Sequence, residues 1–377
     1  MSTPPELAAW LRLTLTPGVG AETQRKLLTA FGLPEAIFAA SFSALRGVAG
    51  EVVSGNLLTV DDSVASAIDS AMAWAAEAGN SLITLADADY PRALLDAPDP
   101  PVLLYCKGRR ELLSCPMIAI VGSRNATAQG ERDATAFAKA LGEAGLTIVS
   151  GLALGVDAAA HRGGLETAAS TIAVIGTGAD RLYPARNAAL GRELADRGAI
   201  ISEFPLGTAA LAGNFPRRNR IIAGLAKGTL VVEAAPNSGS LITARLATDA
   251  GREVFAIPGS IHSPMARGCH QLIRQGAKLV ETAEDILEEL RWNRPSAVKR
   301  GTNLPVGAGR TPSVGGMVTD TDQTRVIQAL GQSPTNLETI ATRSGLTPAA
   351  LLAILLPMEL NGQVAQLPGG LYQRINA

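Results

Sequence analysis

The densest group of side chains that could bind an anion lies in residues 213–227, GNFPRRNRIIAGLAK. Arginine guanidinium groups bind phosphates through paired hydrogen bonds, and a nearby aromatic ring can stack on an unpaired base. The segment contains no acidic residue, which favours contact with a phosphate chain that carries exposed bases. The alternative is a solvated helix start whose arginines pair with carboxylates such as Glu203. The residues expected to bind are Phe215, Arg217, Arg218, Asn219, Arg220 and Lys227.

Three small-residue turns each follow a predicted strand and lead into a helix, and they are the second source of anion-binding groups. Free backbone N–H groups and the helix dipole favour negative charge at such turns, which gather at the carboxyl edge of a parallel sheet. The first turn also carries a cation, Arg124. The residues expected to bind there are Gly122, Ser123 and Arg124 in the first turn, Gly151 in the second, and Ser238, Gly239, Ser240 and Thr243 in the third.

No constellation for catalysis or metal binding can be assembled from these loops. Asp157 is expected to hydrogen-bond the backbone at the start of a helix, and His161 to be structural or a pocket wall. The sequence lacks the G-x-x-x-x-G-K-[ST] motif and has GSRNATAQG where a G-x-G-x-x-G dinucleotide fingerprint would stand. Its three cysteines are scattered without metal-ligand spacing. We therefore expect no catalytic residue, no metal and no cofactor.

Composition excludes several classes of protein. The 377 residues are 47% hydrophobic and carry a net charge of −1, so any basic nucleic-acid surface must be local. Aromatic residues make up only 4%, which argues against a long stacking platform. The N-terminus lacks the charge pattern of a signal peptide, and no apolar run is long enough to span a membrane. A cytoplasmic protein without membrane contact is expected.

The elements that must position these loops belong to an α/β domain, assigned to residues 80–290. Short β-branched runs flanked by Gly or Pro alternate with helical segments, which predicts a Rossmann-like, doubly wound sheet with helices on both faces. Residues 80–108 form a connector whose strands, Leu82–Leu85 and Val102–Tyr105, extend the edge of this sheet. The other predicted strands are Met117–Val121, Leu146–Val149, Thr171–Ile175, Ile200–Glu203, Thr229–Glu233, Val254–Ile257 and Lys278–Val280.

Smaller modules flank this domain. Residues 1–79 are helical by pattern, and the Pro-Gly-Val-Gly turn within Leu15–Gly32 predicts either a helix-hairpin-helix element that holds phosphate or a plain helical bundle. Residues 291–320 are rich in Gly and Pro and predict a linker. Residues 321–377 read as three helices and a hairpin, the order of a winged helix. The third of these helices, Pro348–Leu360, has no Lys or Arg, so protein contact or packing is favoured over groove recognition.

Seven motifs, in order along the chain, resemble those of the DNA-processing protein A (DprA/Smf) family. They are Ala119–Thr127, Ser150–His161, Gly176–Asn187, Ser202–Gly207, Asn214–Leu225, Ser238–Ala244 and the Pro258-Gly259 loop.

The resemblance implies a cytoplasmic protein that binds single-stranded DNA, protects it, dimerises through the Rossmann-like domain and loads the RecA recombinase during natural transformation. It also implies that Arg124, Phe215 and the Ser238–Thr243 turn line the DNA pocket together with Arg217, Arg218 and Asn219, and that the N-terminal module is sterile-alpha-motif-like. One departure is His270, which stands where many members have Asn, so no role is carried over to it. The dimer interface is expected at the far end of the domain, Val254–Val280.

Two other functions remain open. A nucleotide phosphoribohydrolase-like enzyme would use the same type of sheet with a catalytic acid in a glycine turn, but an alignment with that turn puts Thr243 at the position of the acid. A nucleotide-sensing regulator is the lesser option.

Overall fold

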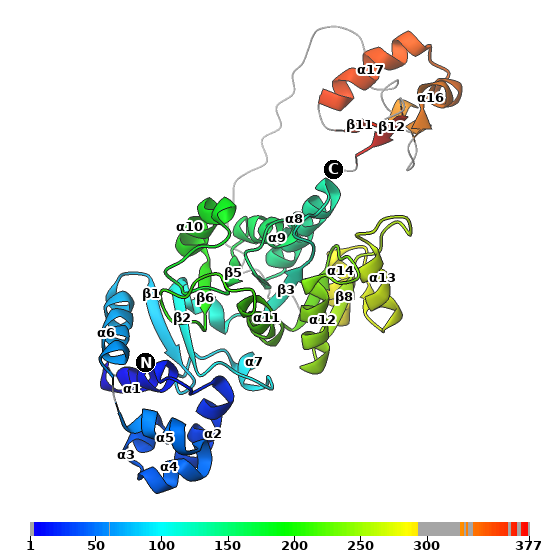
Figure 1. Ribbon diagram of the computed structural model, residues 1–377. Helices are drawn as coiled ribbons and strands as arrows, with labels where there is room; N and C mark the ends of the chain where they lie inside the picture. The colour runs from blue at the N-terminus through cyan, green and yellow to red at the C-terminus, as the bar shows by residue number, and fades with distance from the viewer. Residues whose placement is uncertain are drawn as a thin grey trace, which may run out of the picture. The chain divides into compact units, whose positions relative to one another are not determined.

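The computed structural model describes residues 4–59, 61–292, 325–327, 329–330, 335–360, 363–367 and 371–375. These residues fall into two compact units, Met1–Val298 and Lys299–Ala377 (Figure 1). Within the described ranges, no helix combines the length and the apolar character needed to cross a membrane.

The first unit is built on a nine-stranded sheet of order β1-β2-β6-β5-β4-β3-β7-β8-β9. The strands from β3 to β9 pair in parallel, whereas β1 and β2 join in antiparallel fashion beside β6. The two connector strands therefore extend the sheet edge as predicted. The bounds are β1 Asn80–Thr84, β2 Leu103–Gly108, β3 Met117–Val121, β4 Thr147–Ser150, β5 Thr171–Val174, β6 Ala199–Ser202, β7 Gly228–Val231, β8 Glu253–Ala256 and β9 Lys278–Leu279.

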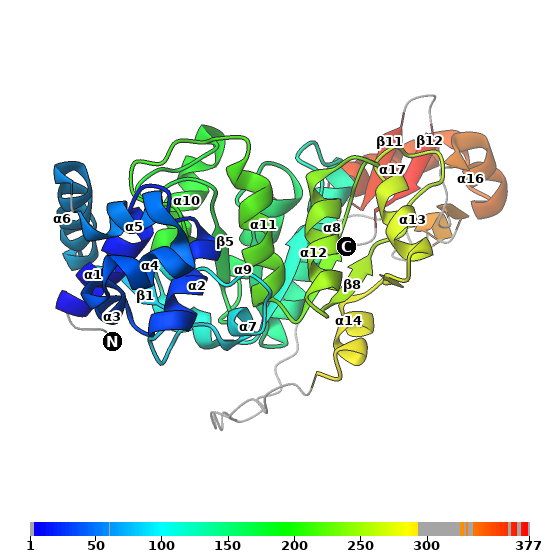
Figure 2. The same cartoon turned by 60° about the horizontal axis from the view of Figure 1, so that its bottom comes forward.

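Helices cover both faces of this sheet, which confirms the doubly wound prediction (Figures 1 and 2). Alternate side chains of β3 point to opposite faces. Ile118 and Ile120 pack with α8 and α9, while Ala119 and Val121 belong to the cluster that includes α11 and α12. On the first face lie α8 (Ala128–Glu143), α9 (Val156–Leu165), α10 (Ala188–Arg197) and α14 (Ala283–Glu289); on the second lie α11 (Asn214–Leu225), α12 (Gly239–Asp249) and α13 (Arg267–Arg274).

The strand order reverses beside β3. The chain moves outward from β3 through β4 and β5 to β6, then returns to place β7 on the other side of β3. The loops that leave β3 and β7 diverge at this point, and ligands of open parallel sheets bind in the resulting crevice.

The N-terminal segment is helical, as predicted, and packs on the antiparallel edge of the sheet. Trp10 of α1 and Trp74 of α6 share a buried cluster with Tyr105 of β2, whose ring centroid lies 5.8 Å from that of Trp74. A separate core that includes Leu27 and Leu45 holds α1 to α5 together. The helices are α1 Pro4–Leu15, α2 Ala21–Phe31, α3 Pro34–Ala39, α4 Phe42–Ala49, α5 Glu51–Leu58 and α6 Asp62–Ala76; the short helices of the sheet domain are α7 Arg92–Leu95, η1 Arg110–Ser114 and η2 Ala185–Asn187.

The second unit has the winged-helix order. Residues 325–327 and 329–330 are helical, and the later elements follow in the predicted order: α16 (Leu337–Ser344), α17 (Pro348–Leu360), β11 (Val364–Leu367) and β12 (Leu371–Arg374). A two-residue strand, β10 (Thr335–Asn336), pairs with β12 and was too short to leave a pattern. Leu351, Leu355 and Met358 of α17 are buried in the core of this unit, which is the packing role expected of an apolar helix. Residues 293–320 of the predicted linker lie outside the described residues.

A buried hydrogen-bond chain ties α9 to β4 and β5. Thr171 Oγ1 donates to Ile148 O (2.9 Å), so it accepts from Nδ1 of His161 at 2.7 Å. Nε2 of His161 is left to accept the N–H of Leu152 (3.3 Å). Burial, aided by the nearby Arg218 guanidinium, lowers the pKa of His161 to about 3. This neutral histidine is structural, as predicted.

Acid should therefore destabilise the fold through His161. Its pKa is 6.5 in the unfolded chain and about 3 in the folded one. Its contribution to stability is complete above pH 6.5 and is lost as the pH falls toward 3, by up to about 1.4 kcal/mol per pH unit. Urea denaturation between pH 7 and pH 5 should show this slope, and His161→Gln should reduce it by the contribution of one proton. Equal slopes in the two proteins would contradict the assignment.

Candidate functional site

A pocket of about 610 Å³ opens at the carboxyl edge of the sheet, at the reversal point between β3 and β7. Its walls are the loop after β3, the start of α9, one side of α11 and the turn that enters α12. Two sequence segments about a hundred residues apart, the glycine turn after β3 and the arginine-rich helix, thus meet here. The predicted residues that line it are Gly122, Ser123, Arg124, Phe215, Arg218, Asn219, Ser238, Gly239, Ser240 and Thr243.

The turn after β3 is shaped by its small residues and projects one cation. A Cβ on Gly122 would lie 2.6 Å from the Val156 side chain, so only glycine allows this approach of α9. Ser123 is buried; its carbonyl accepts the N–H of Val156 and its hydroxyl that of Asn125. Arg124 is exposed at the pocket wall, and it forms no salt bridge with any acidic residue that the structure describes. Gly122 and Ser123 therefore position Arg124.

Arg124 lies over an aromatic ring of α11. Its Cζ is 5.7 Å from the ring centroid of Phe215, a cation–π distance. Asn214, the residue before it, donates from Nδ2 to Gly176 O (3.0 Å) and fixes the start of α11. The ring of Phe215 also lies 5.6 Å from that of Tyr183, measured between ring centroids. Tyr183 lies in the Gly176–Asn187 motif and was not among the predicted site residues, although its place after β5 puts it at the same sheet edge.

The glycine turn after β4 does not offer its N–H groups to a ligand. Oδ2 of Asp157 accepts the N–H groups of Gly151 (3.1 Å) and Ala153 (3.3 Å), as expected for a residue at a helix start. The N–H of Leu152 is bound by His161. The prediction that Gly151 contacts a ligand is therefore corrected. Gly151 is needed because a Cβ there would lie 2.2 Å from Arg218.

Arg218 is a buried cation beneath the pocket. It is 4% exposed and hydrogen-bonds to Val174 O at the end of β5, while its Nε has no hydrogen-bond partner among the described residues. Burial lowers the pKa of Arg218 to about 10, partly offset by Asp157, so it stays charged at neutral pH. Burial likewise raises the pKa of Asp157, against the field of Arg218. Arg218 thus places positive charge in the floor of the pocket without reaching solvent.

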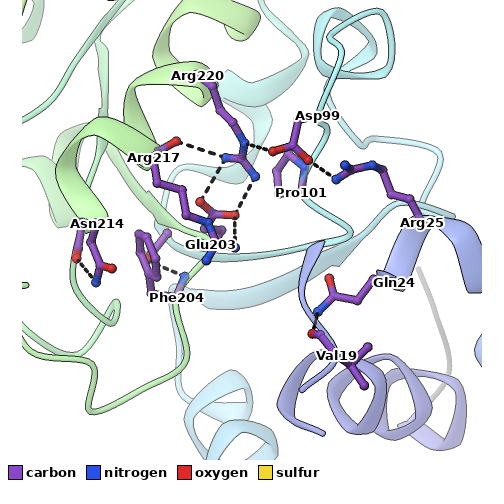
Figure 3. Close-up of polar contacts among 12 residues, drawn as sticks. Val19, Gln24, Arg25, Asp99, Pro101, Glu203, Phe204, Asn214, Arg217 and Arg220 are labelled. Atoms are coloured by element: carbon purple, nitrogen blue, oxygen red, sulfur yellow. Dashed lines mark hydrogen bonds and ion pairs between the residues drawn. The ribbon is translucent and has the colours of Figure 1, made fainter. Parts of the chain in front are cut away.

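The other two arginines of α11 are held by carboxylates (Figure 3). Nη2 of Arg220 lies 2.7 Å from Glu203 and its Nε lies 2.6 Å from Asp99, which also pairs with Arg25 of α2. Burial disfavours the charge on Arg220, but Glu203 and Asp99 outweigh it and raise the pKa. Arg217, half exposed, lies 3.3 Å from Glu203. Neither residue lines the pocket, and both pair with carboxylates, which is the alternative that the sequence left open. The prediction that Arg220 binds DNA is therefore replaced by a structural role.

The prediction that Lys227 belongs to the binding site is also wrong. It directly precedes β7 and therefore lies at the amino edge of the sheet, opposite the pocket. Its backbone N–H donates to Met117 O, and its ammonium lies 6.0 Å from the Trp292 ring centroid.

The start of α12 closes the pocket with hydroxyl and backbone groups. Ser238 caps the helix by accepting the N–H of Ser240 (3.3 Å), and the two hydroxyls lie 2.7 Å apart. Asn219 reaches Gly239 O at 3.5 Å, and open space surrounds Cα of Gly239. Thr243 is buried. Asp157 is the single acidic residue in the pocket wall, and within the described ranges no cluster of His, Cys, Asp or Glu is arranged to hold a metal. The pocket is suited to bind an anion.

Two family models match the chain. DNA recombination-mediator protein A matches residues 81–291, and the DprA winged helix domain matches residues 312–370. Among curated proteins, Protein Smf of Escherichia coli is 40% identical over 304 residues, which cover 80% of each chain. DNA processing protein DprA of Streptococcus pneumoniae is 46% identical over 209 residues, 55% of this chain and 74% of the relative.

Solved structures agree with these matches. The X-ray structure of DprA from Streptococcus pneumoniae aligns with a TM-score of 0.66 at 37% identity, covering 74% of this chain and 95% of that one. DNA processing protein A from Helicobacter pylori, whose structure describes its single-stranded DNA binding mode, aligns with a TM-score of 0.51 at 31% identity, covering 56% and 95%.

Through its contacts with Glu203 and Asp99, Arg220 is expected to stabilise the folded protein. The Glu203 side chain is 4% exposed, and Arg220→Ala would leave it with Arg217 alone. Removing one partner of a buried pair costs about 3–5 kcal/mol, and the remaining arginine reduces this to roughly 2–3 kcal/mol of unfolding free energy. Arg124→Ala, at an exposed position, should stay within about 0.5 kcal/mol of the parent. Urea denaturation measures both, and equal stabilities would refute the structural role of Arg220.

Proposed function

The chain belongs to the DNA recombination-mediator protein A family, and from this membership we propose that it binds single-stranded DNA in the carboxyl-edge pocket. The observation that carries the proposal is Arg124 over Phe215, beside the start of α12. A cation, an aromatic ring and a helix N-terminus together match a phosphate chain with accessible bases better than they match a duplex.

Phosphate is bound by three kinds of group in this proposal. The exposed guanidinium of Arg124 forms charge-assisted hydrogen bonds. The N-terminus of α12, where Ser238 caps the N–H of Ser240, attracts phosphate through the positive end of the helix dipole. Buried Arg218 adds an electrostatic attraction from below. Since Asp157 is buried and its Oδ2 is occupied by backbone N–H groups, an entering phosphate meets no exposed carboxylate in the pocket wall.

Bases are bound by stacking. Phe215 offers its ring to any base, so the expected sequence preference is small. A duplex keeps its bases stacked inside and presents only its backbone to such a pocket. The H. pylori relative, similar over 56% of this chain, binds single-stranded DNA. Its likeness supports the same strand preference here.

A non-enzymatic role is part of the proposal. Thr243 occupies the position aligned with the acid of phosphoribohydrolase-like enzymes, and it is 2% exposed. Asp157 is committed to the backbone. Neither residue is placed to act as a general acid on a bound nucleotide. Release of free base from nucleoside monophosphates would favour the enzyme instead.

We further propose that the protected strand is passed to the RecA recombinase in natural transformation, and that the protein acts in the cytoplasm as a homodimer. Support for the recombinase comes from the family resemblance. Support for a dimer comes from the far end of the sheet, where β9 is an edge strand of two residues and Leu279 is 45% exposed. Such an edge is available for pairing with a second chain.

Arg124→Ala should weaken binding of single-stranded DNA. One charge-assisted contact is worth about 1.5–3 kcal/mol, which is roughly a 10- to 150-fold loss of affinity. The dependence of log K on log salt should also become shallower by about 0.7 for the lost phosphate contact. Fluorescence anisotropy with a labelled oligothymidylate measures both quantities.

Lys227→Ala is the matched control for Arg124→Ala, because it removes one exposed positive charge at the opposite edge of the sheet. It should retain the affinity of the parent protein. A folded Arg124→Ala variant that binds as tightly as Lys227→Ala would show that the DNA site lies elsewhere.

Leu279→Lys should weaken the homodimer, because it puts a charge at the exposed sheet edge where β9 would meet a second copy. Sedimentation equilibrium should show a dimer for the parent and a shift toward monomer for the variant. Val52→Lys, at a residue that is 77% exposed on α5, is the control. A monomeric parent, or a variant that dimerises equally, would remove this interface.

A further inference from the structure

The loop that follows β5, residues 175–187, puts a second aromatic ring next to the pocket. Tyr183 is 50% exposed, and its ring plane is inclined by 39° to that of Phe215. Arg124 lies at 5.7 Å and Tyr183 at 5.6 Å from the Phe215 ring centroid. Arg124 and Phe215 line the pocket, whereas Tyr183 lies beyond its wall. We call these three side chains the stacking series.

The same loop carries two exposed arginines. Arg186, in η2, forms no salt bridge with any residue in the described ranges. Arg181 has a side chain that is 56% exposed, and its contact with Asp180 is long, at 3.9 Å. Asp180 is the loop's single acidic residue, and its carboxylate also accepts the N–H of Gly207 (2.9 Å). Positive charge in this loop is thus available to a ligand.

Hydrogen bonds hold the loop in place at both ends. Thr177 Oγ1 donates to Arg181 O (2.7 Å), and Gly178 N donates to Thr208 O (3.0 Å) in the neighbouring loop. At the far end, Nδ2 of Asn187 donates to Leu152 O (2.9 Å) below the pocket. An aromatic ring on a loop fixed in this way loses little conformational freedom when a base stacks on it.

We propose that Tyr183, Arg181 and Arg186 form a second subsite for single-stranded DNA, continuous with the pocket. The strand leaves the pocket past Phe215, the next base stacks on Tyr183, and the two arginines contact its phosphates. This subsite rests on the proposed function of the pocket and adds the direction in which the strand runs, across the carboxyl edge from β7 toward β5.

The distance that the strand must cover between the pocket and Tyr183 determines which oligonucleotide lengths can test the second subsite. From β7 to β5 the sheet has three strand steps. At about 4.8 Å each they span roughly 15 Å. That is about four nucleotides at a rise of 3.4 Å, and fewer for a stretched strand. A very short oligonucleotide fills the pocket alone, whereas a longer one also reaches Tyr183. Length dependence therefore separates the two subsites.

Affinity should be measured for oligothymidylates from about 2 to about 20 nucleotides, a range that begins below the roughly four nucleotides of the route and extends past the site sizes of known single-strand binders. For long oligonucleotides, Tyr183→Ala should lose affinity by about 5- to 100-fold. For the shortest ones it should bind as the parent does. Tyr183→Phe should retain full affinity, since the ring remains. Arg186→Ala should resemble Tyr183→Ala and make the salt dependence shallower for long strands only.

Photocrosslinking tests contact with DNA directly, because a Tyr183 that only packed against Phe215 would not place a base over the loop. A long oligonucleotide that carries 5-iododeoxyuridine should crosslink to the loop 175–187 when the base lies over Tyr183, as mapped by mass spectrometry. Unchanged affinity of Tyr183→Ala for long strands, an equal loss at every length, or absent crosslinks would each overturn the subsite. Failure of the parent to bind any oligothymidylate would instead overturn the proposed function of the pocket.

Discussion

A guanidinium buried under the carboxyl edge of the sheet fixes the geometry of the pocket. Arg218 reaches from α11 to the last carbonyl of β5 and passes so close to Gly151 that a Cβ there would lie 2.2 Å away. Asp157, which binds the turn after β4, favours the charged form of Arg218 electrostatically. The hydrogen bond from Arg218 to Val174 O thus helps to hold α11, and with it Phe215 and Asn219, against the end of β5.

Three arginines within four residues of α11 consequently do different things. Arg218 is buried beneath the pocket. Arg220 is paired with Glu203 and Asp99, and the half-exposed Arg217 pairs with Glu203 (Figure 3). Because Asp99 also pairs with Arg25 of α2, the same network connects the N-terminal helices to the sheet domain. The exposed charge of the pocket comes from Arg124 instead, a residue of a different loop.

The sequence predicted the parts that depend on local pattern. The strand Met117–Val121 and the helix Pro348–Leu360 have the predicted bounds because their apolar runs end at clear breakers or caps. The meeting of the Arg124 turn with α11 and α12 followed from the rule for parallel sheets. Partners distant in sequence could not be predicted: Asp99 lies 121 residues from Arg220, and nothing local reveals that contact. The prediction for Lys227 could have been avoided from the sequence, because a residue just before a strand lies at the amino edge of the parallel sheet.

The preference for single strands is the central claim, and a salt series tests it most directly. Binding of an oligothymidylate and of a duplex of equal length should be compared by anisotropy from low to moderate salt. About two to four phosphate contacts predict a slope of roughly −1.4 to −2.8 for the single strand, with tighter binding than the duplex at every salt concentration because stacking on Phe215 persists. Equal affinity for both forms at every salt concentration would contradict this account of the pocket.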